Sequence, residues 1–146
     1  MTSSEQIFDT IIGEQPIDPH LLAAGVDALQ ECALACTVCA DADLAEAQPA
    51  DLVECIRRNR DCLEVCAAAI GVVARWRQDN HALVVRLLEA CVVACDLCAQ
   101  ECDRHDHEHC RKCSLACRRC ESACRALLEE VEREVDEGYD VSGSTH

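Results

Sequence analysis

The sequence predicts an all-α fold, an antiparallel up-down four-helix bundle with a short N-terminal helical segment. Two observations support this prediction. No stretch alternates polar and apolar residues with a period of two, so a β-sheet is not expected. The cysteines recur at spacings of three, four and seven residues, which is the periodicity of helices that turn one face toward a bundle core. At 146 residues, the chain is long enough for one domain and too short to predict two.

Three dipeptides mark the starts of helices. An aspartate before a proline is typical of a helix N-terminus, where it caps free amide groups, and Asp18-Pro19 has this form. Gln48-Pro49 repeats the signal, and Asp79-Asn80 offers a third start. The predicted helices therefore run from residue 19 to about 47, from 49 to about 78, and onward from 81.

The stretch from residue 81 to 137 contains no proline or glycine. One helix of that length would be roughly 85 Å long, so a turn is expected within it. The most polar part is residues 103 to 109, where Asp106 can cap a new helix, which gives helices over about 81–104 and 107–137. Gly138 is expected to end the last one.

The expected organisation has three parts. Residues 1–17 form an N-terminal segment, in which Ile7, Phe8, Ile11 and Ile12 suggest a short amphipathic helix. Residues 18–137 form the bundle, and residues 138–146 form a flexible tail.

The net charge of −15 argues against a nucleic-acid partner, because phosphate binding requires clustered lysine and arginine. The first residues carry no basic or twin-arginine signal, and no apolar run is expected to approach the length of a membrane span. The sequence therefore predicts a cytoplasmic protein with no membrane partner. Cytoplasmic cysteines are kept reduced, which favours metal binding or catalysis over a disulfide scaffold.

The 15 cysteines occupy the core-facing seam of all four predicted helices, so each thiol should point inward. Cysteine as a small core residue would explain one or two of them, but leucine or isoleucine would stabilise a core better. The predicted metal ligands are Cys32, Cys36, Cys39, Cys55, Cys62, Cys66, Cys91, Cys95, Cys98, Cys102, Cys110, Cys113, Cys117, Cys120 and Cys124.

Among metals that thiolates select, Cu(I) fits this pattern best. Two or three thiolates satisfy Cu(I), whereas zinc requires a tetrahedron and iron–sulfur clusters usually draw on cysteines in loops. If each ion takes two sulfurs and each sulfur serves two ions, the capacity is about 15 Cu(I), and the ions neutralise the buried thiolates. A metallothionein-like zinc buffer and an iron–sulfur electron carrier remain as alternatives. No cysteine stands out with an activating base, so an enzyme is not expected.

The repeated C-x3-C-x2-C pattern, seen at Cys32-Cys36-Cys39 and again from Cys91 to Cys102, resembles the cytosolic type of the copper storage protein family. The resemblance extends from the first to the last predicted helix. It implies a four-helix bundle filled with Cu(I) thiolates, assembled as a homotetramer and serving metal homeostasis. A copper chaperone or a low-molecular-weight thiol is the expected donor. Asn59 interrupts the cysteine seam, at a position where a thiol is absent.

In an up-down bundle, Cys39, Cys55, Cys102 and Cys110 should meet at one end. The opposite end should be closed by an apolar plug, made of Leu21, Leu22, Val26, Leu29, Ile70, Val73, Trp76, Val84, Leu87, Leu88, Leu127, Leu128 and Val131. The predicted turn at the cysteine end carries three histidines: His105, His107 and His109. Histidine can hold an incoming ion before the thiolates take it, although solvated histidines in a polar turn are an equally good interpretation.

Overall fold

A computed structural model describes residues 1–13 and 16–143, with side chains to residue 133. Throughout this part of the chain the regular structure is helical, so the all-α prediction is confirmed. The helices are α1 (Ser3–Phe8), α2 (Pro19–Leu44), α3 (Val53–Ala74), α4 (His81–Cys102) and α5 (Glu108–Gly143), with short 3-10 helices η1 (Pro49–Leu52) and η2 (Gln78–Asn80).

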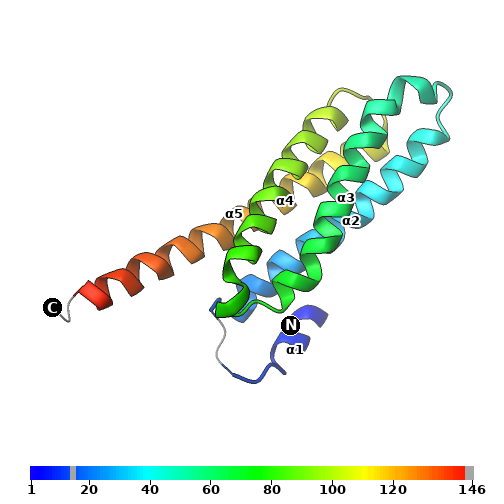
Figure 1. The fold of residues 1–146 in the computed structure, drawn as a ribbon. Coiled ribbons are helices and arrows are strands. Elements are labelled where there is room, and N and C mark those ends of the chain that lie inside the picture. The colour runs from blue at the N-terminus through cyan, green and yellow to red at the C-terminus, as the bar shows by residue number, and fades with distance from the viewer. Residues whose placement is uncertain (14–15, 144–146) are drawn as a thin grey trace.

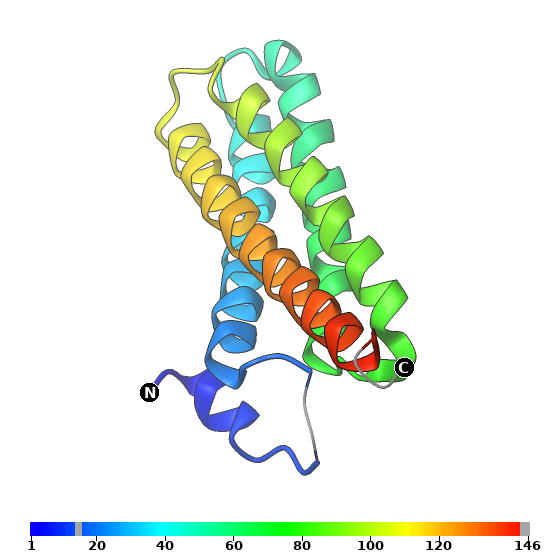
Figure 2. The same cartoon turned by 90° about the vertical axis from the view of Figure 1, so that its left-hand side faces the viewer.

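The four long helices form a closed ring in which α2 packs on α3, α3 on α4, α4 on α5 and α5 back on α2. Their connections lie at alternating ends of the molecule (Figures 1 and 2). The α2–α3 and α4–α5 links share one end, while the α3–α4 link and α1 lie at the other. This is the predicted antiparallel up-down bundle.

The start of α2 follows the predicted capping pattern. The Asp18 carboxylate accepts hydrogen bonds from the backbone N–H groups of His20 (2.7 Å) and Leu21 (3.3 Å), and Pro19 occupies the first helical turn. The Gln48-Pro49 signal instead begins a 3-10 helix, and the α-helix follows it. Both helices end a few residues before the expected positions, because residues 45–48 and 75–77 are needed to reverse the chain.

Two expectations about the last helix were wrong. Helix α5 begins at Glu108, so His107 and not Asp106 directly precedes it, and the Asp106 backbone carbonyl accepts a hydrogen bond from the Arg111 guanidinium. The helix also continues through Gly138 to Gly143. A single glycine costs about 1 kcal/mol of helix propensity and does not by itself end a helix. The final turns extend away from the bundle (Figure 1), and residues 144–146 of the expected flexible tail lie outside the described residues.

Helix α2 is long and apolar enough, by length and composition, to cross a membrane, contrary to the expectation that no segment approaches this length. The core helix of a soluble bundle passes the same test. In the structure α2 packs between α3 and α5 and buries its cysteines against theirs. Packing in the bundle accounts for only part of its apolar character, because 39% of its most apolar stretch is buried and Leu34, Val38 and Leu44 are exposed.

The end opposite the histidines is filled with apolar side chains, as predicted. Leu22, Leu29, Val73, Trp76, Val84, Leu88 and Leu127 are each at most 1% exposed. Leu21, Ile70, Leu87 and Leu128 pack around them with partial exposure.

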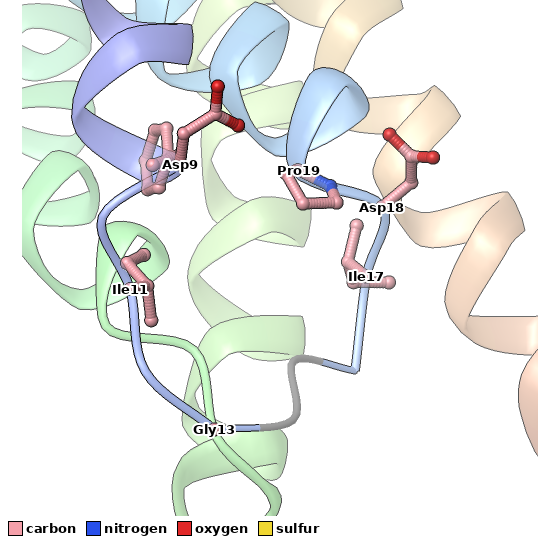
Figure 3. A pocket seen from close by; sticks show the side chains of 7 residues that line it. Asp9, Ile11, Gly13, Ile17, Asp18 and Pro19 are labelled. Carbon is pink, nitrogen blue, oxygen red and sulfur yellow. The ribbon is translucent and has the colours of Figure 1, made fainter.

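The N-terminal segment adds to this plug in a way that periodicity did not indicate. Phe8 of α1 and Ile17 are buried, whereas Ile7 and Ile12 are exposed. Gly13 turns the intervening loop with a φ of 98°, and Ile11 and Ile17 stand on its two arms, beside a pocket of about 380 Å³ (Figure 3).

Candidate metal centre

All 15 cysteine side chains lie inside the bundle with free thiols, and none is more than 1% exposed. The sulfurs form a network that crosses between helices. Cys32 of α2 illustrates it, since its Sγ lies 3.6 Å from Cys62 Sγ of α3, 3.8 Å from Cys95 Sγ of α4 and 3.7 Å from Cys117 Sγ of α5. The prediction that the thiols point inward is confirmed.

Several groups of sulfurs converge closely enough to hold a metal ion, with their atoms within 4.8 Å of one another. Three of these groups consist of four thiols: Cys32, Cys62, Cys66 and Cys95; Cys32, Cys36, Cys62 and Cys117; and Cys36, Cys98, Cys113 and Cys117. Because neighbouring groups share members, one sulfur can serve more than one ion. Bridging of this kind is what a multinuclear thiolate cluster requires.

Two completely buried polar residues stand beside the cysteines of the seam. Asp43 follows Cys39 by four residues, and Asn59 follows Cys55 by four, so both continue the heptad spacing. Both side chains are completely buried, and the Asn59 amide donates to the Asp43 carboxylate at 3.5 Å. Asn59 was identified from the sequence as a break in the cysteine seam, whereas Asp43 was not predicted, although the same spacing rule identifies it.

Asn59 lies in the middle of the thiol network. Its Oδ1 accepts from the thiols of Cys98 (3.2 Å), Cys113 (3.4 Å) and Cys102 (3.8 Å), and its Nδ2 lies 3.7 Å from Cys55 Sγ. The amide therefore satisfies its hydrogen-bonding groups with four thiols and one carboxylate. It occupies the space in which a sixteenth cysteine would stand.

Of the three predicted histidines, His109 lies closest to the thiols. Its Nδ1 is 3.5 Å from Cys39 Sγ and 3.6 Å from Cys110 Sγ, and it also lies 3.5 Å from the Asp43 carboxylate. Its other nitrogen, Nε2, lies 2.9 Å from the Glu46 carboxylate. A histidine bound through Nε2–H to a carboxylate presents the lone pair of Nδ1 toward the two sulfurs.

His105 and His107 surround this position from outside. His105 Nε2 lies 3.1 Å from the Glu101 carboxylate, and the His107 ring stacks on His109 with centroids 5.3 Å apart. Together with Glu46, these two histidines line a pocket of about 360 Å³ at the mouth of the bundle. The structure thus places His109 against the thiols and the other two histidines beside the opening.

Burial and neighbouring charge shape the proton affinities at this end. Desolvation, followed by the charges of Cys39 and Asp43, raises the pKa of the Cys110 thiol. Desolvation is also the main cause that raises the pKa of Asp43. Burial alone would lower the pKa of His109, but its contacts with Cys39 and Glu46 outweigh this effect and raise it. The metal-free mouth therefore favours a neutral thiol at Cys110.

Deeper in the bundle, contacts with Cys124 and Cys66, together with burial, raise the pKa of Cys91. A thiol of this kind stays protonated at neutral pH until a metal displaces the proton. Reduced, mostly protonated sulfurs with close neighbours are a suitable store for a soft monovalent cation.

Comparison with known proteins agrees with this geometry. Residues 19–129 match the family model of the copper storage proteins. A copper storage protein from Streptomyces lividans, solved with 10 copper equivalents, is 39% identical, with 88% of this chain and 99% of that chain covered and a TM-score of 0.84. No curated protein matches the chain.

Two further likenesses are close. A cytosolic copper storage protein from Streptomyces lividans with five coppers is 44% identical over 75% of this chain and 93% of that one, with a TM-score of 0.73. Copper storage protein 3 of Bacillus subtilis, without copper, is 31% identical over 72% of this chain and 96% of that one, with a TM-score of 0.62. With the family model covering most of the bundle and its cysteine seam, the chain belongs to the copper storage protein family.

Proposed function

We propose that this protein stores Cu(I) in the cytoplasm by binding about one ion per thiol inside the bundle. The observation that carries the proposal is the network of 15 buried free sulfurs contributed by all four long helices. Copper storage within this family, and the copper-loaded relatives from Streptomyces lividans, support it. The role is storage or detoxification without catalysis, and the assembly is a homotetramer loaded by a chaperone or a small thiol.

Titration of the reduced protein with Cu(I), against a chelator that competes for the ion, tests the capacity. We expect saturation at about 15 ions per chain, because two-coordinate ions with bridging sulfurs give one ion per thiol. Saturation at three or four ions would point to tetrahedral, zinc-like sites instead. Metal analysis of protein from cells supplied with both metals separates copper storage from a zinc buffer, and visible charge-transfer bands would identify an iron–sulfur carrier.

The route of copper is proposed to pass the three histidines. The interior of the opposite end is filled with buried apolar side chains, so an ion crossing this plug would lose its hydration without gaining a ligand there. At the mouth, His105 and His107 line the opening and His109 contacts Cys39 and Cys110. This arrangement provides a series of donors from solvent to the first sulfurs.

Stopped-flow measurement of copper uptake tests the route. Replacement of all three histidines with alanine should slow uptake and leave the final capacity at about one ion per thiol. The matched control, Cys91→Ser with Cys124→Ser, alters the far end of the thiol network and should lower capacity with little change in the initial rate. An unchanged rate in the histidine variant, or a large loss of rate in the control, would contradict the proposed route.

A further inference from the structure

Four side chains at the mouth differ in chemistry from the remainder of the thiol network. Cys39, Asp43, His109 and Cys110 each direct one ligand atom to a common point, with all four atoms within 4.8 Å of one another. The set contains two sulfurs, one nitrogen and one oxygen. The deeper groups named above contain sulfur alone.

The distances among these atoms match the edges of a tetrahedron around zinc. Zinc lies about 2.3 Å from a sulfur ligand and about 2.0 to 2.2 Å from a nitrogen or oxygen ligand. In a tetrahedron, these bond lengths place two sulfurs about 3.8 Å apart, sulfur about 3.6 Å from nitrogen or oxygen, and nitrogen about 3.4 Å from oxygen. The two sulfurs, of Cys39 and Cys110, lie 3.9 Å apart. His109 Nδ1 lies 3.5 and 3.6 Å from them.

The Asp43 carboxylate provides the fourth corner of the same tetrahedron. Asp43 Oδ1 lies 3.6 Å from Cys110 Sγ and 3.5 Å from His109 Nδ1. Cu(I) gains little from a carboxylate, because it is a soft ion and oxygen is a hard ligand, whereas zinc accepts sulfur, nitrogen and oxygen together. A completely buried carboxylate among thiols is therefore better explained by a divalent ion than by Cu(I).

The surroundings hold the ligands in place. Glu46 lies 2.9 Å from the outer nitrogen of His109, and Asn59 donates to the second oxygen of Asp43. Ligands oriented by a hydrogen bond on their far side are typical of protein zinc sites. The net charge of the site also favours zinc over Cu(I). Two thiolates and one carboxylate carry three negative charges, so the site keeps a net charge of −1 with Zn²⁺ bound and −2 with Cu(I) bound.

We infer that Cys39, Asp43, His109 and Cys110 form a tetrahedral Zn²⁺ site at the mouth of the bundle. Binding joins one Zn²⁺ to two sulfurs, one nitrogen and one oxygen, and the two thiol protons leave to solvent. The inference of a zinc site rests on the geometry of these four residues and does not depend on the proposed copper storage. If the chain also stores Cu(I), the two metals share the sulfurs of Cys39 and Cys110, and excess Cu(I) displaces the zinc.

X-ray absorption at the zinc edge tests the inference directly, using the full reduced chain with one equivalent of Zn²⁺. The expected coordination is two sulfurs and two nitrogen or oxygen atoms. Competition with a chelator should then show at least a tenfold loss of zinc affinity in Asp43→Asn and in His109→Ala. Glu46→Gln, which removes the carboxylate that supports His109 and also contacts His107, should weaken binding about tenfold.

Cys91→Ser, at the far end of the thiol network, is the control and should leave the affinity for the first Zn²⁺ unchanged. Four sulfurs around the ion, or full affinity in Asp43→Asn with its helix content intact, would overturn the inference. Cu(I) capacity is measured on the same Asp43→Asn protein and should stay at about one ion per thiol. A failure of copper storage is thereby distinguished from a failure of the zinc site.

Discussion

Replacement of Asn59 with cysteine should add one Cu(I) ion to the capacity of the protein. The residue is completely buried and contacts the thiols of Cys98, Cys102 and Cys113 through Oδ1. A sulfur at this position would lie among sulfurs that already face it, and would complete the run of four seam positions in α3. At one ion per thiol, the expected capacity rises from about 15 to about 16 ions.

Native mass spectrometry of the copper-saturated protein resolves single ions and is the appropriate assay. Asn59→Ala is the matched control, because it removes the same amide without supplying a thiol, and its capacity should equal that of the parent chain. A copper count in Asn59→Cys equal to that of Asn59→Ala would refute the idea that each seam sulfur holds one ion. A loss of helix by circular dichroism in both variants would instead assign Asn59 a role in folding.

Three further outcomes are expected. The apo protein should show nearly full helix content by circular dichroism, because the apolar plug is sufficient to fold the bundle. Its melting temperature should rise strongly on copper binding, because the metal binds the native state. A mostly unfolded apo chain would contradict this expectation. Gly25→Ala should lower the melting temperature by several degrees, since its Cβ would stand 2.5 Å from a methyl group of buried Leu127. Gly71→Ala, whose Cβ would meet only the flexible side chain of Arg75, should instead stabilise the protein by about 0.5 to 1 kcal/mol. Differential scanning calorimetry of both variants measures the contrast, and equal shifts in melting temperature would argue against close packing at Gly25. NMR titration should place the pKa of His20 above 6.5, because its hydrogen bond to Glu5 favours the protonated ring. The pair should therefore stabilise the attachment of α1 below pH 6.5 and lose this effect as the pH rises through the raised pKa of His20. Glu5→Gln should return the pKa of His20 to near 6.5.

The helices and the burial of the thiols could be predicted from the sequence because both follow from local periodicity. A seam of cysteines at spacings of three and four defines the inner face of a helix without knowledge of its neighbours. Asp18 with Pro19 likewise specifies a helix start through contacts within one turn. These features require no tertiary information.

Asp43 shows where local reasoning was insufficient. Near a helix end, an aspartate usually faces solvent, and its burial here depends on the start of α5 and on Asn59 of α3 coming to the same point. The histidines posed the same difficulty. Their positions in a turn do not determine which ring points inward, and only the packing of α5 against α2 directs His109 to the sulfurs.

The complete burial of the thiols has a consequence for how the protein behaves outside its interior. Each protonated thiol that binds Cu(I) exchanges one proton for one monovalent cation, so the number of charges on the chain stays the same. A filled molecule is heavier than an empty one, yet it should migrate to nearly the same position in a native electrophoretic gel. The solution, in contrast, is acidified by about one proton for every ion stored, which makes loading visible to a pH electrode.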